Sequence, residues 1–295
     1  MRTPVYTGSG VAIVTPMNTD FSINYPKLGE LIDWQIENGT DAIIICGTTG
    51  EASTMTDEEH IECVRHAVER TAKRVPVIAG VGSNDTAYAL WLCKEAKRAG
   101  ADALLNVTPY YNKTSQRGLI AHFTACADAT DLPTILYNVP SRTGMTINPE
   151  TYFELSKHPN IVGTKEASSN IAAIAKTASL CGPDFAIYSG NDNEIIPLMS
   201  LGGKGVISVL ANICPRETHD MTKLYLDGKC TEATKMQLDY LNLVDAIFCD
   251  VNPIPVKEAL NMMGKAAGPC RLPLYELSDA HKDLLRRELA AKGLV

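Results

Sequence analysis

Residues 41–74, DAIIICGTTGEASTMTDEEHIECVRHAVERTAKR, contain one complete alternation of an apolar run and an amphipathic segment. The run at 41–47 is apolar almost throughout, which is typical of a strand that is covered on both faces. Thr56 is a suitable N-cap, three acidic residues follow it, and basic residues at the far end suit the negative end of the helix dipole. The stretch therefore predicts a strand over 41–47 and a helix over 56–74.

The same alternation repeats along the first 210 residues. Eight short apolar runs are separated by segments with helix-start signals: GVAIVTP (10–16), DAIIICG (41–47), VPVIAGVG (75–82), ADALLNVTP (101–109), PTILYNV (133–139), IVGTKE (161–166), FAIYSG (185–190) and GVISVL (205–210). Strands of this kind, each followed by one helix, form a parallel sheet, and eight units close most naturally as a (β/α)8 TIM barrel of the α/β class. An open doubly wound sheet is the alternative.

Residues 215–295 differ from this pattern because they contain only helix-like segments, such as PRETHDMTKLYLDGK (215–229) and TEATKMQLDYLNLVDAIF (231–248). No low-complexity linker precedes them. We therefore predict a barrel over 1–214 and a C-terminal helical domain over 215–295.

Composition excludes several classes of protein. The 295 residues are 45% hydrophobic and 21% charged, which is typical of a globular chain with a sizeable core. A formal net charge of -7 disfavours nucleic acid, because phosphate contacts are made mainly by Lys and Arg. We expect neither a membrane span nor a secretion signal, and hence a cytoplasmic protein. The acidic balance instead favours a small molecule as the partner. The nine cysteines lack paired spacing such as C-x-x-C, so we expect free thiols.

In a TIM barrel, the residues at the C-terminal ends of the strands face the active site. The second strand leads into GTTGE (47–51), where Thr48 and Thr49 offer hydroxyl and N–H groups that suit a carboxylate. A glycine-rich turn with capping threonines is the alternative. The fourth strand leads into TPYYNKTSQ (108–116), whose two tyrosines could simply pack a loop.

The fifth and sixth strand ends carry the more reactive groups. YNVPSRTG (137–144) places the phenol of Tyr137 at the mouth and the guanidinium of Arg142, which fits a carboxylate, just beyond it. The sixth strand brings Lys165 to the same face, unless that lysine only forms an ion pair with Glu166 or with another carboxylate at the mouth. The joint occurrence of these groups favours a single reaction site.

A lysine amine attacks a carbonyl only when it is unprotonated. At the reference pKa of about 10.4, roughly one lysine in a few thousand is neutral at pH 7. The apolar run around Ile161 and Val162, together with a nearby Arg142, would favour the neutral form of Lys165. Such an amine forms an imine with a 2-oxo acid, whose methyl group then loses a proton, and the enamine attacks an aldehyde. Threonine and tyrosine hydroxyls can carry the protons.

The motifs GTTGE, TPYYNKTSQ, YNVPSRTG, GTKEAS and YSGND, in this order and spacing, resemble those of the dihydrodipicolinate synthase family of pyruvate-dependent class I aldolases. The resemblance covers nearly the whole chain. It implies a TIM barrel lyase that condenses pyruvate with L-aspartate 4-semialdehyde in lysine and diaminopimelate biosynthesis. It further implies a homotetramer built as a dimer of dimers, and no metal or organic cofactor in catalysis.

The resemblance also assigns roles to residues. Those implied in catalysis are the Schiff-base lysine and a proton relay, whose last member crosses from a neighbouring subunit: Lys165, Tyr137, Thr48 and Tyr111. Those implied in substrate binding hold the pyruvate carboxylate, receive the semialdehyde carboxylate, or line the site with backbone carbonyls: Thr49 (with Thr48), Arg142, Gly190 and Ile207.

Rival functions remain open at this stage. N-acetylneuraminate lyases and 2-keto-3-deoxy sugar acid aldolases share the lysine and the tyrosine, but neuraminate lyases typically carry serine in place of Thr48 and lack an arginine at Arg142. Both positions favour the synthase. A non-catalytic oxo-acid sensor or an assembly subunit would keep the fold without the chemistry, and the intact lysine, tyrosine and threonine set disfavours both.

Many members of the family are inhibited by lysine, which binds at a dimer interface. The matching positions here are Ala52, Ser53, Asp57, His60, Asn84, Tyr88 and Tyr110. His60, Asn84 and Tyr110 are of the expected type, whereas lysine-sensitive members carry a glutamate at Tyr88 and a histidine or aromatic residue at Asp57. A phenol cannot neutralise the ammonium of the ligand, so the sequence predicts weak or absent feedback unless Asp57 supplies a substitute charge.

Overall fold

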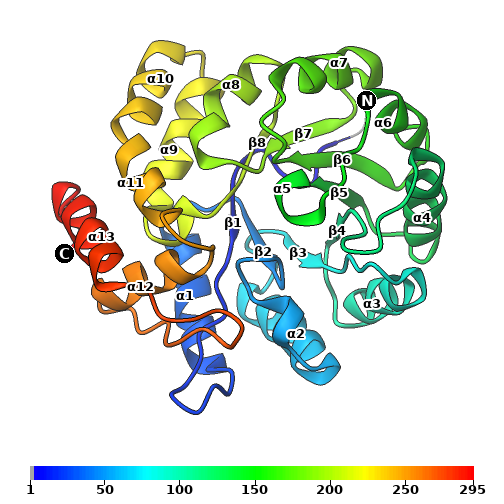
Figure 1. Cartoon of the computed structure of the whole chain (residues 1–295). Helices are drawn as coiled ribbons and strands as arrows, with labels where there is room; N and C mark the ends of the chain where they lie inside the picture. The colour runs from blue at the N-terminus through cyan, green and yellow to red at the C-terminus, as the bar shows by residue number, and fades with distance from the viewer. Residues whose placement is uncertain (1–2) are drawn as a thin grey trace.

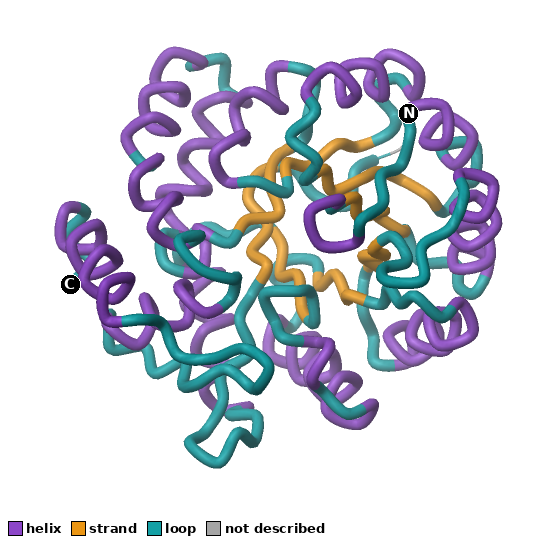
Figure 2. The backbone as a smooth tube through the Cα atoms, viewed as in Figure 1, coloured by secondary structure: helices purple, strands orange, loops and turns teal. Residues whose placement is uncertain are grey.

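The computed structural model describes residues 3–295 and has a closed barrel of eight parallel strands at its centre (Figures 1 and 2). The strands are β1 (Gly8–Ala12), β2 (Ala42–Ile45), β3 (Val77–Gly80), β4 (Ala103–Val107), β5 (Thr134–Asn138), β6 (Ile161–Glu166), β7 (Ala186–Ser189) and β8 (Gly205–Ser208). They neighbour each other in chain order, and β8 pairs with β1. The predicted TIM barrel is therefore confirmed, and the open sheet is wrong.

The first strand begins earlier than the predicted run at 10–16. β1 starts at Gly8, which pairs with Gly205 of β8, and a Cβ atom at Gly205 would lie 1.8 Å from the Gly8 carbonyl oxygen. This close backbone approach requires glycine. A strand that opens with Gly-Ser-Gly carries little apolar signal, which explains the displaced prediction.

Helices surround the barrel in a ring (Figure 2). Those between the strands are α1 (Tyr25–Glu37), α2 (Asp57–Thr71), α3 (Thr86–Arg98), α4 (Gln116–Asp128), α5 (Pro140–Thr143), α6 (Pro149–Leu155), α7 (Ile171–Cys181) and α8 (Ile195–Ser200). In α2 the Thr56 hydroxyl accepts from the Glu59 N–H, and the Glu59 carboxylate accepts from the Thr56 N–H. This capping box confirms the predicted start of the helix.

The last part of the chain is helical, as predicted. It comprises α9 (Pro215–Leu226), α10 (Cys230–Asp239), α11 (Leu241–Ile247), α12 (Ile254–Met262) and α13 (Asp279–Ala291), which gather on one side of the barrel in Figure 1. α9 packs both on β1 and on α10. It therefore belongs to the covering of the barrel as much as to the helical part, and a domain boundary between residues 214 and 215 stays a prediction.

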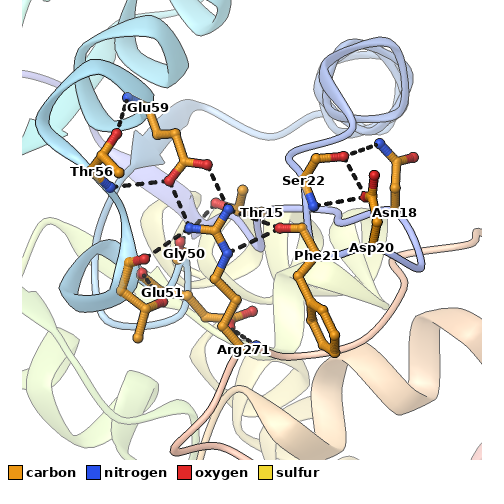
Figure 3. Close-up of polar contacts among 11 residues, drawn as sticks. Thr15, Asn18, Asp20, Phe21, Ser22, Gly50, Glu51, Thr56, Glu59 and Arg271 are labelled. Atoms are coloured by element: carbon orange, nitrogen blue, oxygen red, sulfur yellow. Dashed lines mark hydrogen bonds and ion pairs between the residues drawn. The ribbon is translucent and has the colours of Figure 1, made fainter.

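One segment of this helical part returns to the N-terminal half of the barrel. The Arg271 guanidinium donates to both carboxylate oxygens of Glu59 at 2.6 Å, to the Phe21 carbonyl, and to the Thr54 carbonyl at 2.8 Å (Figure 3). Its backbone N–H donates to Glu51 at 2.9 Å. Residues far apart in sequence are thus fixed beside the turn that follows β2.

The barrel interior is closed at one end by stacked aromatic rings. The rings of Tyr6 and Tyr188 lie 4.6 Å apart, and each hydroxyl donates to a backbone carbonyl. The opposite end, where the strands finish, is the one that can admit a ligand. Within residues 3–295 no helix is long and apolar enough to cross a membrane, and no group of His, Cys, Asp and Glu side chains has the arrangement of a metal site.

Candidate active site

Lys165 lies near the C-terminal end of β6, beside Tyr137 on the neighbouring strand. Its ammonium is 4.4 Å from the centre of the Tyr137 ring, and both side chains are buried. Successive residues of a strand point to opposite faces, so Lys165 faces the inside of the barrel and its neighbour Glu166 faces the helices. The barrel register thus brings the predicted amine and phenol together.

Glu166 does not form an ion pair with Lys165, contrary to the alternative interpretation of that lysine. Its carboxylate accepts hydrogen bonds from Tyr152 at 2.6 Å, from Ser168 at 2.8 Å and from Asn138 at 3.0 Å. Burial raises the pKa of Glu166, while these hydrogen bonds act in the opposite direction. The ammonium of Lys165 is consequently left to the interior cavity.

A cavity of about 210 Å³ lies above Lys165 at the mouth of the barrel. The predicted site residues that line it are Thr48, Thr49, Tyr137, Arg142, Lys165 and Gly190. They come from the turn after β2, from β5 and α5, from β6 and from the end of β7. Thr49 is buried and forms part of the base of the cavity. Thr48 and Arg142 are exposed and form part of its rim, where the cavity opens to solvent.

The absence of a side chain at Gly190 provides the space that the Lys165 side chain occupies. A Cβ atom at this position would lie 3.1 Å from Cε of Lys165 and 2.8 Å from Cβ of Ala167. A side chain here would therefore crowd the reactive amine. Beside it, the buried Asp192 accepts from the Ser208 hydroxyl at 2.5 Å; burial raises the pKa of Asp192, and the charge of Lys165 opposes that shift.

Two predicted residues are not brought into the cavity. Ile207 is fully buried and packs with Tyr137 inside the barrel, so any contribution to the site would come from its backbone. Tyr111 is 91% exposed and has a positive φ of 67°, an unusual combination for a large aromatic residue. It does not line the cavity of its own chain, and its role in a neighbouring subunit stays a prediction.

The helical C-terminal part supplies two residues that the sequence analysis missed. Phe248 and Asn252 line the same cavity. The Asn252 amide donates to the Thr49 hydroxyl at 2.9 Å, and its backbone carbonyl accepts from Arg142 at 3.1 Å. A rule based on strand ends cannot find these residues, because they lie between helices; a polar asparagine between two apolar segments is the only local signal.

A second cavity, of about 380 Å³, adjoins the first and shares Thr48, Tyr137 and Arg142 with it. The regulatory candidates that line it are Ala52, Ser53, His60, Tyr88 and Tyr110. Asn84 is not among its lining residues, and its carbonyl accepts from the Asn112 amide.

Two polar contacts define the chemistry of this second cavity. The Tyr88 hydroxyl donates to Asp57 at 2.6 Å, and burial followed by this hydrogen bond raises the pKa of Tyr88. Burial lowers the pKa of His60, whose ring lies 2.9 Å from the Gly80 carbonyl oxygen. The cavity is therefore lined by an imidazole whose pKa is lowered and by a tyrosine whose hydroxyl donates to Asp57, while Asp57 itself, like Asn84, is not among the lining residues.

Comparison with known proteins agrees with the geometry. The chain is 59% identical over 292 residues to the 4-hydroxy-tetrahydrodipicolinate synthase of Lachnoclostridium phytofermentans, covering 99% of each. It is similar in structure to the chloride-inhibited dihydrodipicolinate synthase of Acinetobacter baumannii complexed with pyruvate, with a TM-score of 0.96, 42% identity and coverage of 98% and 99%. For the lysine-bound enzyme of Cyanidioschyzon merolae, the TM-score is 0.97 and the sequence identity is 41%, and the match covers 99% of this chain and 100% of that enzyme. Since the model of the Dihydrodipicolinate synthetase family also matches residues 5–292, the chain belongs to that family.

Proposed function

We propose that the protein is a 4-hydroxy-tetrahydrodipicolinate synthase, which condenses pyruvate with L-aspartate 4-semialdehyde in lysine and diaminopimelate biosynthesis. The observation that carries this proposal is the placement of Lys165 against Tyr137, in a cavity that Thr48, Thr49 and Arg142 also line. The similarity of the whole chain to synthases of this name supports it.

The chemistry follows from the placement of the groups. The neutral amine of Lys165 attacks the keto carbon of pyruvate, the oxygen leaves as water, and an imine forms. The methyl group then loses a proton to give an enamine, whose carbon attacks the aldehyde of the second substrate, and the aldehyde oxygen takes up a proton to become a hydroxyl. The amino group of the second substrate then displaces Lys165 from the regenerated imine, which closes the ring and frees the lysine. Thr49 holds the first carboxylate, Arg142 the second, and the hydroxyls of Tyr137 and Thr48 carry protons.

The rival aldolases differ in what their second substrate requires. The guanidinium of Arg142 lies on the cavity rim, where it suits a carboxylate at the far end of a short aldehyde. A cavity of about 210 Å³ also suits two small acids better than an extended sugar acid. Both observations favour the synthase.

The test is reduction with borohydride in the presence of pyruvate, followed by mass spectrometry of the peptides. The parent protein should gain one pyruvate on the peptide that contains Lys165, and Lys165→Ala should gain none. Lys113→Ala, which alters an exposed loop lysine, is the matched control and should trap pyruvate as the parent does. A parent that traps none is a sensor or an inert subunit, and a parent that cleaves N-acetylneuraminate efficiently belongs with the rival aldolases.

Assembly and location extend the same proposal. The exposed Tyr111 supports a dimer in which this phenol completes the proton relay of the partner, and two such dimers would form the tetramer. The cysteines of the described chain are all free thiols, which supports a reducing compartment and hence the cytoplasm.

A further inference from the structure

The turn at 47–51, GTTGE, is held by side chains from the C-terminal helical part. Asn252 contacts Thr49 in its middle, and Lys257 contacts Glu51 at its end. We propose that Asn252 and Lys257 are positioning residues that hold this turn in the conformation in which Thr49 offers its hydroxyl proton to the substrate carboxylate. The inference rests on the proposed function, because it takes Thr49 as a ligand of the pyruvate carboxylate.

The contact at Thr49 fixes the direction of one proton. A threonine hydroxyl has one hydrogen to donate and lone pairs that accept. The Asn252 amide donates to the Thr49 oxygen at 2.9 Å, so that lone pair is occupied and the hydroxyl hydrogen is directed elsewhere. Both side chains are at least nine-tenths buried, and both line the cavity. The proton of Thr49 is consequently available to an anion bound above Lys165.

The contact at Glu51 fixes the backbone of the turn. Glu51 adopts a left-handed conformation with φ of 58°, which a residue with a side chain rarely holds without outside support. Its carboxylate is fully buried and accepts from Lys257 at 2.7 Å and from the Arg271 N–H at 2.9 Å, the latter beside the network in Figure 3. Lys257 also donates to the carbonyls of Thr15 and Pro269, so every direction of the ammonium is used.

Gly50, the residue before Glu51, is held by a hydrogen bond from Thr15, which follows β1. The Thr15 hydroxyl donates to the Gly50 carbonyl at 2.7 Å, while the Thr15 carbonyl accepts from Lys257. Asn252 in turn connects the residues that are predicted to bind the two substrate carboxylates. Its side chain donates to Thr49, and its backbone carbonyl accepts from Arg142. The segment that contains Asn252 and Lys257 therefore sets the relative placement of both predicted carboxylate ligands.

The first experiment compares two asparagine variants of the full-length enzyme. Asn252→Ala should raise the KM for pyruvate about tenfold, the factor that corresponds to losing one modest polar contact, while kcat at saturating pyruvate changes less than about threefold. Asn261→Ala is the matched control, since Asn261 belongs to the same helical part but binds only the backbone of Gly268. It should lower the melting temperature and leave the KM for pyruvate unchanged.

A double-mutant cycle tests whether Asn252 acts through Thr49. The variant Asn252→Ala/Thr49→Val should have the same KM for pyruvate as Thr49→Val alone, within about twofold, because the first change acts only on a hydroxyl that the second has removed. Multiplied effects would overturn the inference. They would mean that Asn252 also contacts the substrate directly, through the N–H of its side-chain amide that does not donate to Thr49.

Lys257 needs a different variant, because Lys257→Met alone leaves the Glu51 carboxylate buried and unpaired and so threatens folding. The variant Glu51→Gln/Lys257→Met removes both charges. If it melts cooperatively and its KM for pyruvate rises several-fold, the positioning role of the pair is supported; an unchanged KM in the folded variant overturns it. A parent that traps no pyruvate defeats the proposed function, whereas a parent that traps pyruvate with Asn252→Ala unchanged in KM defeats only this inference.

Discussion

At the scale of single residues, two charged neighbours on one strand have opposite environments. Lys165 faces the cavity against the Tyr137 ring, and Glu166 faces the helices, where Tyr152, Ser168 and Asn138 satisfy its carboxylate. The alternation of the strand alone separates them. This separation keeps a carboxylate from pairing with an amine that must be neutral to react.

Arg142→Ala should act on the second substrate and spare the first. The guanidinium lies on the cavity rim, and losing a charge-assisted hydrogen bond to a carboxylate costs about 1.5 to 3 kcal/mol, roughly ten- to more than a hundredfold in kcat/KM for L-aspartate 4-semialdehyde. Pyruvate trapping should persist. Arg117→Ala, a change at an exposed arginine on α4, is the control, and unchanged kinetics in Arg142→Ala would contradict the role.

The residues that sequence could identify are those near strand ends. Tyr137 and Lys165 follow apolar runs, so a barrel prediction places them at one mouth before any coordinates are known. Asn252 could not be placed in this way, because its contact with Thr49 spans 203 positions and depends on how the C-terminal helices pack. The orientation of Tyr111 was equally inaccessible from one chain, since a loop conformation decides it.

At the scale of elements, α9 is linked to the start of the barrel by an ion pair. His219 on α9 lies 3.0 Å from Asp41, which precedes β2 and also accepts from the Ser9 N–H of β1. The hydrogen bond to Asp41 raises the pKa of His219, and burial opposes that shift. The link therefore joins the helix after the last strand to the first two strands in a pH-dependent manner.

His219→Gln should lower stability at low pH and have less effect at high pH. A histidine with a raised folded pKa contributes its full stabilisation below the unfolded pKa of about 6.5 and loses it as pH rises through the folded value. At pH 5.5 the free energy of unfolding of the parent should exceed that of the variant by less than about 1 kcal/mol, the usual contribution of a partly exposed ion pair. At pH 9 the difference should be smaller. Urea melts at both values measure this, with Asp41→Asn as the matched partner change. A deficit that grows with pH would refute it.

The cavity between α2 and α3 carries the prediction on feedback. By the family resemblance, Tyr88 matches the position at which lysine-sensitive members carry a glutamate, and the nearby Asp57 accepts from the Tyr88 hydroxyl at 2.6 Å. Losing one charge-assisted hydrogen bond costs about 1.5 to 3 kcal/mol, so we expect weak inhibition by L-lysine. Condensation rates measured against L-lysine test this. Half-inhibition well below about 1 mM, equivalent to only about 4 kcal/mol of binding, would contradict it.

A paired variant sharpens this test. Asp57→His/Tyr88→Glu installs the carboxylate without placing a second one beside it and should lower the half-inhibiting concentration by at least about tenfold. Asp57→His alone, which removes the only nearby carboxylate without adding one at Tyr88, is the control and should not gain sensitivity. Equal inhibition of all three proteins would show that Tyr88 does not set the response.

At the scale of the whole molecule, barrel closure follows from a repeated sequence pattern. The strands neighbour each other in chain order, so eight local alternations suffice to predict the architecture. The junction of the barrel with the helical part is less predictable, because α9 packs on both. Association between copies depends on surface residues, of which the exposed Tyr111 is the most informative.

Mixing two inactive variants should restore activity if Tyr111 acts across a dimer. Lys165→Ala keeps Tyr111, and Tyr111→Phe keeps Lys165, so each mixed dimer contains one site with both groups. Random reassociation of equal amounts gives mixed dimers in half of the population, and hence about a quarter of the parent activity. Measurement of the condensation rate before and after subunit exchange tests this. No recovery, with mixed dimers verified by native mass spectrometry, would assign Tyr111 no role in the partner's site.

The contacts of Arg271 and Lys257 with Glu51 also have a consequence for synthesis of the chain. β8 ends at residue 208, but the partners of Glu51 lie at positions 257 and 271. At about 5 to 20 residues per second, the ribosome needs roughly 3 to 13 s to travel from the last strand to Arg271. During that interval a nascent barrel has all its strands but an unsupported turn. A transcript truncated after residue 250 would therefore yield a product that binds pyruvate more weakly, although every strand and Lys165 itself had been translated.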